Sequence, residues 1–250
     1  MKRAALLVVL LCAASAHSED LSWQPVHIKK SYGRCGDYPC VRAELAYPLF
    51  EAGASSEALN AVNGAVRGLL GRSIIEGQDD LSFEAWMNDL LAQYMKLRRA
   101  RPELPGNWWL QRESTVLSTA PVLSLSCEES AYTGGAHPSV VRKYLVFDPP
   151  SGRRLFLEDL LRRGALAKLM KAAERRLRIL RKVPEGELSA AGFLFKDGRF
   201  ALPGEFALAD EGLRLRYDAG SVLPYARGAI DLVVPFSDLK GVLKREYLPK

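Results

Sequence analysis

The segment from Tyr132 to His137 carries the residue types best suited to recognition or chemistry. It reads Tyr132, Thr133, Gly134, Gly135, Ala136 and His137. The two glycines permit positive φ angles and let the backbone approach a ligand or another strand closely, and the histidine is able to act as a base or as a ligand. The structural alternative is a tight glycine turn held by a hydrogen bond from the histidine. We prefer this interpretation to ligand binding, and we prefer ligand binding to catalysis. If the chain has a binding site, we expect this loop to form it.

The remaining polar residues do not assemble into a known catalytic pattern. The adjacent carboxylates Glu128 and Glu129 would point to opposite faces of a strand, so they cannot form an acid/base pair across one substrate. Ser130 lies outside a Gly-x-Ser-x-Gly elbow. No His-x-x-x-His or Cys-x-x-Cys pair offers metal-ligand spacing. The sequence therefore predicts a chain that is not an enzyme and has no catalytic residues, metal or cofactor.

The cysteines indicate an oxidising compartment. Cys35 and Cys40 bracket the turn-forming insert Gly-Asp-Tyr-Pro, and we predict a disulfide that closes this short loop. Cys127 follows an alternation of leucine with serine and shares the face of the leucines. We therefore predict that Cys127 is a buried free thiol rather than a nucleophile.

Residues 162–182 form a strongly basic segment. They contain nine basic residues against one acidic residue, Glu174, in a chain whose formal charge is +6. Apolar residues recur at intervals of three and four, which predicts an amphipathic helix; they are Leu166, Leu169, Met170, Ala173, Leu177 and Leu180. We expect the basic face of this helix to lie in solvent while its apolar stripe packs against the core. The alternative is attraction to anionic lipid headgroups or envelope polymer.

Residues 1–18 have the pattern of a cleavable signal peptide. Lys2 and Arg3 precede an apolar run from Ala4 to Ala14, and small residues follow. The run is too short for a transmembrane helix, which takes about 20 residues. A lipid anchor on Cys12 is the alternative, although Leu11 stands where a lipobox has a small residue. We expect a periplasmic or secreted protein without a transmembrane segment, which makes nucleic acid an unexpected partner.

The hydrophobic pattern predicts an α+β fold with a mainly antiparallel sheet, helices packed against it, and two subdomains. A hairpin over 26–47 is followed by helices over 59–70 and 83–97, and Pro102, Pro105 and Gly106 mark a boundary. Later strands are predicted over 108–117, 122–128, 140–147, 193–195, 200–202, 206–208, 213–217 and 230–234. The Asp197-Gly198 pair predicts a hairpin turn. The predicted divisions are the signal peptide 1–18, one subdomain over 19–105 and another over 106–250.

Several motifs of the second subdomain occur together in a known family. They are SLSCEESAYTGGAHP over 124–138, FALADEGLRLRYD over 206–218 and DLVVPFSDL over 231–239. This succession resembles the domain of unknown function at the carboxyl end of the anti-sigma factor RsiV and in related exported proteins. Upstream, Tyr47-Pro48 before a helix with Asn60 and Asn63 is similar to the companion domain found in RsiV and in the peptidoglycan deacetylase PdaC.

The resemblance implies an exported, noncatalytic binding module of the cell envelope. Because the extracytoplasmic part of RsiV binds lysozyme, the resemblance implies a lysozyme-type muramidase or a wall glycan as partner, with the loop 132–137 as the contact. Two alternatives are a hydrolase acting on cell-wall polymer, and attachment to anionic envelope polymer through the basic helix 162–182.

Overall fold

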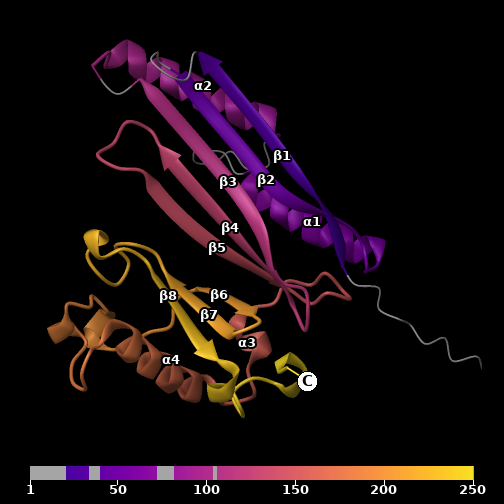
Figure 1. Ribbon diagram of the computed structural model, residues 1–250, viewed down its shortest axis with the longest axis vertical. Coiled ribbons are helices and arrows are strands. Elements are labelled where there is room, and N and C mark those ends of the chain that lie inside the picture. Colours follow the sequence, from indigo (N-terminus) through magenta and orange to yellow (C-terminus); the bar gives the residue numbers. More distant parts are fainter. Residues whose placement is uncertain (1–20, 34–39, 72–81, 104–105, 250) are drawn as a thin grey trace, which may run out of the picture.

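The computed structural model describes residues 21–33, 40–71, 82–103 and 106–249, and every structural statement below concerns these ranges. The predicted signal peptide 1–18 and Cys35 of the predicted disulfide lie outside them. Two antiparallel-rich sheets with helices packed against them confirm the α+β class (Figure 1).

The larger sheet has five strands in the order β1-β2-β3-β4-β5. Neighbouring strands are antiparallel except β2 and β3, which run parallel. The chain joins this parallel pair through two helices that lie on the same side of the sheet (Figure 1). These elements are β1 (Ser22–Gly33), β2 (Cys40–Ala52), α1 (Ser56–Leu70), α2 (Phe83–Ala100), β3 (Asn107–Ser118), β4 (Leu123–Tyr132) and β5 (Ser139–Phe147).

Helices α1 and α2 cover one face of the five-stranded sheet. Each begins at a serine whose side chain accepts a hydrogen bond from a backbone N–H in the first turn, Ser55 in α1 and Ser82 in α2. The apolar side of α1 packs on Leu45, Leu125 and Leu145. The apolar side of α2 packs on the part of the same face that lies nearer the start of β2. The opposite face of the sheet receives no helix (Figure 1).

The smaller sheet has three antiparallel strands and lies between α4 and the lower half of β4 and β5 (Figure 1). Leu208 donates its backbone N–H to Ser124 Oγ at 3.2 Å, which ties β6 to β4. Leu169, Ala173 and Leu177 of α4 are buried in the core that these layers share. The elements are α3 (Leu157–Leu160), α4 (Leu166–Arg181), β6 (Glu205–Ala209), β7 (Gly212–Tyr217) and β8 (Ile230–Pro235), with 3₁₀ turns at Ser189–Ala191, Lys196–Gly198, Tyr225–Arg227, Phe236–Asp238 and Arg245–Tyr247.

The hairpin predicted around Asp197-Gly198 is wrong. These residues form a 3₁₀ turn in which Asp197 has φ 55°, and the flanking residues 193–195 and 200–202 form no strand. The phenylalanines that suggested strands are buried as a ring cluster instead. Phe195 lies 5.5 Å from Phe193 and 5.5 Å from Phe200 between ring centroids. Ring packing in the core of the smaller sheet therefore overrides the local turn preference.

The predicted boundary near residue 105 falls between two strands of one sheet. Val41 of β2 is the register partner of Trp108 of β3, and the pairing continues to Ala46 and Glu113. Residues 19–105 and 106–250 therefore share the five-stranded sheet.

Candidate functional site

The face of the five-stranded sheet away from α1 and α2 is partly open, and we call its uncovered half the open face. Side chains alternate along β3, so that Trp109, Gln111, Glu113 and Thr115 lie on this face and the residues between them face the helices. The lower half of the same side is covered by the smaller sheet, where Tyr144 and Val146 are buried. The uncovered half spans β1 to β5.

An aromatic pair crosses the open face. Trp109 is the register partner of Tyr132 on β4 and of Arg42 on β2. Both rings are partly exposed. The neighbouring Trp108 is buried against α2, with its ring 5.5 Å from that of Tyr94. The tryptophan pair therefore divides between the core and the surface.

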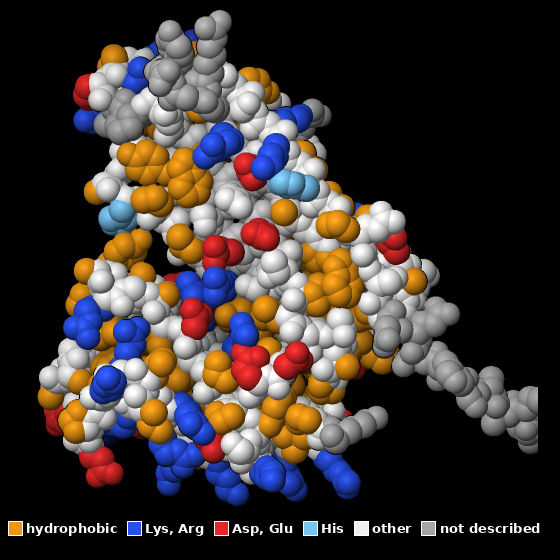
Figure 2. Space-filling model, in the orientation of Figure 1, with side chains coloured by type: hydrophobic (Ala, Val, Ile, Leu, Met, Phe, Trp, Pro, Cys, Tyr) orange, Lys and Arg blue, Asp and Glu red, His pale blue; other side chains and the backbone are white. Residues whose placement is uncertain are grey.

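Two polar rows lie next to the aromatic pair. The register places Glu44, Gln111, Ser130 and Val140 side by side in one row. It places Ala46, Glu113, Glu128 and Arg142 in the next row. Figure 2 shows acidic and basic side chains gathered in the middle of this view.

Most carboxylates in these rows are already engaged by basic side chains. Arg142 donates from Nε to Glu128 Oε2 at 3.0 Å, and Lys29 Nζ lies 3.2 Å from Glu44 Oε2. Arg142 also reaches Asp231 of β8 at 3.6 Å. The open face therefore offers amide, hydroxyl and paired charged groups rather than a field of one sign.

The loop 132–137, predicted as the contact, borders the open face and packs against the 3₁₀ turn Tyr225–Arg227. The His137 ring stacks on Tyr225 with centroids 4.5 Å apart and an interplanar angle of 17°. The Tyr225 hydroxyl donates to the backbone oxygen of Pro138 at 3.3 Å. Gly134 has φ 89°, as its turn requires, and the loop is exposed from Gly135 to His137. The structure thus brings Tyr132 next to Trp109, and His137 next to Tyr225.

A hollow of about 510 Å³ extends the open face across β1, β2 and β3. Aromatic, histidine, amide and carboxylate side chains line it, among them Trp23, His27, Glu44, Gln111 and Glu113. Trp23 is 40% exposed and packs on Phe50 at 5.8 Å between ring centroids. The hollow and the aromatic pair form one continuous strip across the sheet.

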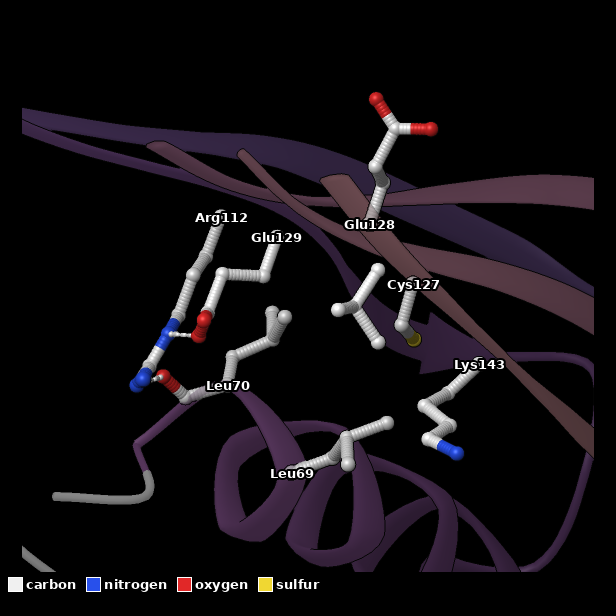
Figure 3. A pocket seen from close by; sticks show the side chains of 8 residues that line it. Leu69, Leu70, Arg112, Cys127, Glu128, Glu129 and Lys143 are labelled. Atoms are coloured by element: carbon white, nitrogen blue, oxygen red, sulfur yellow. Dashed lines mark hydrogen bonds and ion pairs between the residues drawn. The ribbon is translucent and has the colours of Figure 1, made fainter. Parts of the chain in front are cut away.

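A smaller hollow of about 170 Å³ lies on the helix-covered side, between the end of α1 and strands β3 to β5. Figure 3 shows Arg112 and Glu129 turned toward each other, the Cys127 sulfur pointing toward α1, and Glu128 pointing to the other side of the sheet. Arg112 donates from Nε to Glu129 Oε2 at 2.6 Å and from a terminal nitrogen to the Leu70 carbonyl at 2.7 Å. These polar groups serve to fix α1 on the sheet.

Cys127 in this hollow is a free, buried cysteine, as predicted. Burial raises the pKa of its thiol to about 11, and a hydrogen bond to Ser114 Oγ at 3.3 Å acts weakly in the opposite direction. A thiol with such a pKa is protonated at neutral pH, and the thiolate is the nucleophilic form. The hollow therefore lacks an activated sulfur.

Sequence reasoning found part of this site. It singled out the loop 132–137, but it missed the contact with Tyr225 and the row of Glu113, Glu128 and Arg142. The alternation along 107–116 was the available signal for the row on β3. Among the described residues, no group of three His, Cys, Asp or Glu side chains is arranged to hold a metal ion, and none of the described helices has the length and apolar character that a bilayer crossing requires.

Part of the chain matches a known protein family, and its fold is similar to that of two solved structures. Residues 158–237 match the family described as protein of unknown function (DUF3298). A DUF3298 family protein from Pseudomonas aeruginosa PAO1 is similar in structure, with a TM-score of 0.70 and 18% identity over 93% of this chain and 99% of that chain. A member of the same family from Bacteroides fragilis NCTC 9343 has a TM-score of 0.71 and 18% identity over 92% of this chain and 96% of that chain. No curated protein matches the chain.

These matches confirm the predicted resemblance at the level of a DUF3298 domain and a DUF3298-like fold. The family match covers the segment from α3 to the end of β8, whereas the structural similarity extends over nearly the whole chain. The finer resemblance to RsiV and PdaC stays a prediction.

Proposed function

We propose that this chain is an exported, noncatalytic binding module of the cell envelope that holds a wall glycan against the open face. The observation that carries the proposal is the partly exposed pair of Trp109 and Tyr132, opposite each other on β3 and β4 and adjacent to Gln111 and Ser130. Aromatic rings supply a large rigid apolar surface, and Tyr adds a polar tip. Amide and hydroxyl groups both donate and accept hydrogen bonds. Sugar rings present the matching combination of an apolar C–H face and hydroxyl groups.

The geometry favours recognition over hydrolysis. Cleavage of a glycosidic bond by the common route needs two carboxyl groups, one of which carries a proton for the leaving group. Glu113 and Glu128 are register partners on the open face, but Arg142 occupies Glu128 with two N–H groups. His137 is engaged with Tyr225 and Pro138 at the exposed loop. The engagement of Glu128 and His137 by neighbouring groups therefore supports binding rather than acid/base catalysis.

The charges favour a glycan over a cationic muramidase. A basic protein partner is attracted by a surface of net negative charge. On the open face Glu44 is paired with Lys29 and Glu128 with Arg142, and the exposed Arg42 and Glu113 add one further charge of each sign. A neutral, hydroxyl-rich ligand suits this mixture better.

Sedimentation of the chain from residue 19 with insoluble peptidoglycan tests the proposal. We expect Trp109→Ala to weaken binding at least about ten-fold, because truncating a central aromatic contact commonly costs more than about 1.4 kcal/mol. Tyr32→Ala is the matched control. Tyr32 is a 40% exposed aromatic, and its register partner Val41 faces the helices.

The other readings predict different outcomes in the same assay. Equal binding by Trp109→Ala and Tyr32→Ala would remove the open face as the contact. If the chain binds soluble lysozyme but does not bind peptidoglycan, the result would favour a muramidase as the partner. Release of new reducing ends from the glycan, abolished by Glu113→Gln, would show hydrolysis. Unchanged binding by His137→Ala would exclude the loop 132–137 as a glycan contact and would leave the open face of the sheet as the binding site.

A further inference from the structure

Basic side chains cover the lower edge of the molecule, over α4 and the segments beside it. Figure 2 shows Lys and Arg side chains along the lower border, where Figure 1 places α4. We call this region the α4 surface. Its members are Arg162, Arg163, Lys168, Lys171, Arg175, Lys182, Lys240, Lys244 and Arg245.

Some cations of α4 have structural partners, and others face solvent. Arg178 pairs with Glu174, and Arg181 donates to the Ala229 carbonyl. Arg175 and Arg176 both pair with Asp238. Lys168, Lys171 and Lys182 are exposed and repeat at intervals that keep them on the side opposite Leu169 and Leu177. The helix therefore presents a stripe of exposed positive charge away from the core.

The chain brings a second basic segment next to the start of α4. Arg162 donates its backbone N–H to Val242 at 2.9 Å, and Lys244 donates its backbone N–H to Leu160 at 2.9 Å. Lys240 and Arg245 are exposed on this segment, as are Arg162 and Arg163 on the other. Glu158 and Glu246 are exposed acids beside these two segments, and Glu185 is an exposed acid in the hollow that Lys171, Arg175 and Ile179 line. The nine basic members of the α4 surface outnumber these acids.

A large apolar side chain is exposed among these cations. Ile179 is 61% exposed and lies one turn from both Arg175 and Lys182. Leu166 at the start of α4 is 47% exposed, and Leu180 near its end is 51% exposed, but both lie on the same side of the helix as Leu169 and Leu177. Both leucines were predicted to belong to the buried stripe. The structure buries the middle of the stripe and leaves its two ends outside.

We infer that the α4 surface docks on an anionic lipid bilayer. Each Lys or Arg near such a surface contributes about a five-fold gain in binding, and apolar side chains enter the boundary between headgroups and acyl chains. A soluble polyanion would use the charges but would gain nothing from Ile179. The open face is turned toward the viewer in Figure 1, while α4 lies along the lower edge. Docking through α4 therefore leaves the open face accessible.

Co-sedimentation with lipid vesicles tests this inference. The full chain from residue 19 is expected to bind phosphatidylcholine vesicles that contain phosphatidylglycerol, and not pure phosphatidylcholine. Lys168→Glu/Lys171→Glu should lower the partition coefficient at least about twenty-five-fold, the product of two five-fold contributions. Lys96→Glu/Arg99→Glu is the matched control. These residues are exposed, have the same spacing, and lie on α2 at the opposite end of the molecule.

Two further measurements separate a bilayer from a soluble polyanion. Ile179→Gln should weaken vesicle binding several-fold and leave binding to inorganic polyphosphate unchanged. Raising the salt from about 0.1 M to about 1 M should release the protein, since the Debye length falls from about 10 Å to about 3 Å. The inference is overturned if the wild-type chain ignores anionic vesicles, if the α2 control loses as much binding as the α4 variant, or if Ile179→Gln binds vesicles as well as the parent.

Discussion

Arg112 shows how one side chain fixes two helices to the sheet. It is 4% exposed, and besides its bonds to Glu129 and to the end of α1 its guanidinium lies 4.7 Å from the centre of the Trp86 ring on α2. A buried charge is tolerated when its hydrogen bonds are satisfied and it is paired. The planar guanidinium meets both requirements, and its face is free to lie over the indole. The open face on the other side of the sheet depends on this fixed backing.

Cys127 should make stability depend on alkaline pH. Burial raises the pKa of its thiol from 9.0 to about 11, so between these values the unfolded chain loses the proton and the folded chain keeps it. The folded state then binds more protons, and the free energy of unfolding falls with rising pH by up to about 3 kcal/mol. Cys127→Ala removes this contribution. Urea unfolding of both proteins from about pH 8 to about pH 11 should show that, above pH 9, the free energy of unfolding falls more steeply for the parent than for Cys127→Ala. A difference that stays constant over this range would contradict the assignment.

The turn after β5 shows how elements meet through a glycine. Gly152 has φ 67°, and a Cβ atom there would lie 2.5 Å from the backbone oxygen of Ala58 in α1. Ala58 itself is 1% exposed. The turn therefore packs directly on the helix backbone, and this contact closes the core under the lower end of the sheet.

Gly152→Ala should destabilise the fold far more than a glycine substitution in open space. Gly164 has φ 74°, but nothing lies within 4 Å of its would-be Cβ. Gly164→Ala should therefore cost about 1 kcal/mol of unfolding free energy from backbone strain alone. Gly152→Ala adds the clash with α1 and should cost more than about 3 kcal/mol. Urea denaturation of both variants gives the comparison, and equal losses would show that α1 moves away freely.

At the scale of the whole molecule, a chain of ion pairs joins the two sheets. Glu128 of β4 pairs with Arg142 of β5, which reaches Asp231 of β8. Asp231 in turn accepts two hydrogen bonds at 2.8 Å from Arg216 of β7, whose side chain is 6% exposed. The chain runs along the border between the open face and the part that the smaller sheet covers. It therefore holds the lower edge of the proposed glycan site.

Asp231→Asn should loosen the contact between the sheets. The variant removes the charge that Arg142 of β5 meets across the two sheets, and it leaves Arg216 with Asp218 as its carboxylate partner. Half-exposure of Asp231 (55%) limits the effect to about 1–2 kcal/mol of unfolding free energy. Faster hydrogen exchange in β5 and β8 should accompany the loss. Glu211→Gln provides the control, since its pair with Arg214 is exposed and should change stability by less than about 0.5 kcal/mol. Similar effects of the two substitutions would mean that the border pairs do not couple the sheets.

Local pattern predicted most elements. The period of the apolar residues identified α1, α2, α4 and the strands of both sheets, because burial of one face leaves a repeat of 3.6 or 2 in the residues themselves. The α+β class followed from the order of these elements. The prediction failed at Phe193, Phe195 and Phe200, where a period of two came from rings that pack on one another rather than from a strand.

The sequence by itself determined which residues alternate, which segments form α1, α2 and α4, and that Cys127 is buried. The tertiary structure alone decided that β2 and β3 run side by side in parallel, which side of the sheet stays open, and that Tyr225, 87 residues after Pro138, lies against the loop. The physical reason is that periodicity is a property of neighbours along the chain. Strand order and the meeting of distant loops depend instead on how all the apolar faces are buried together.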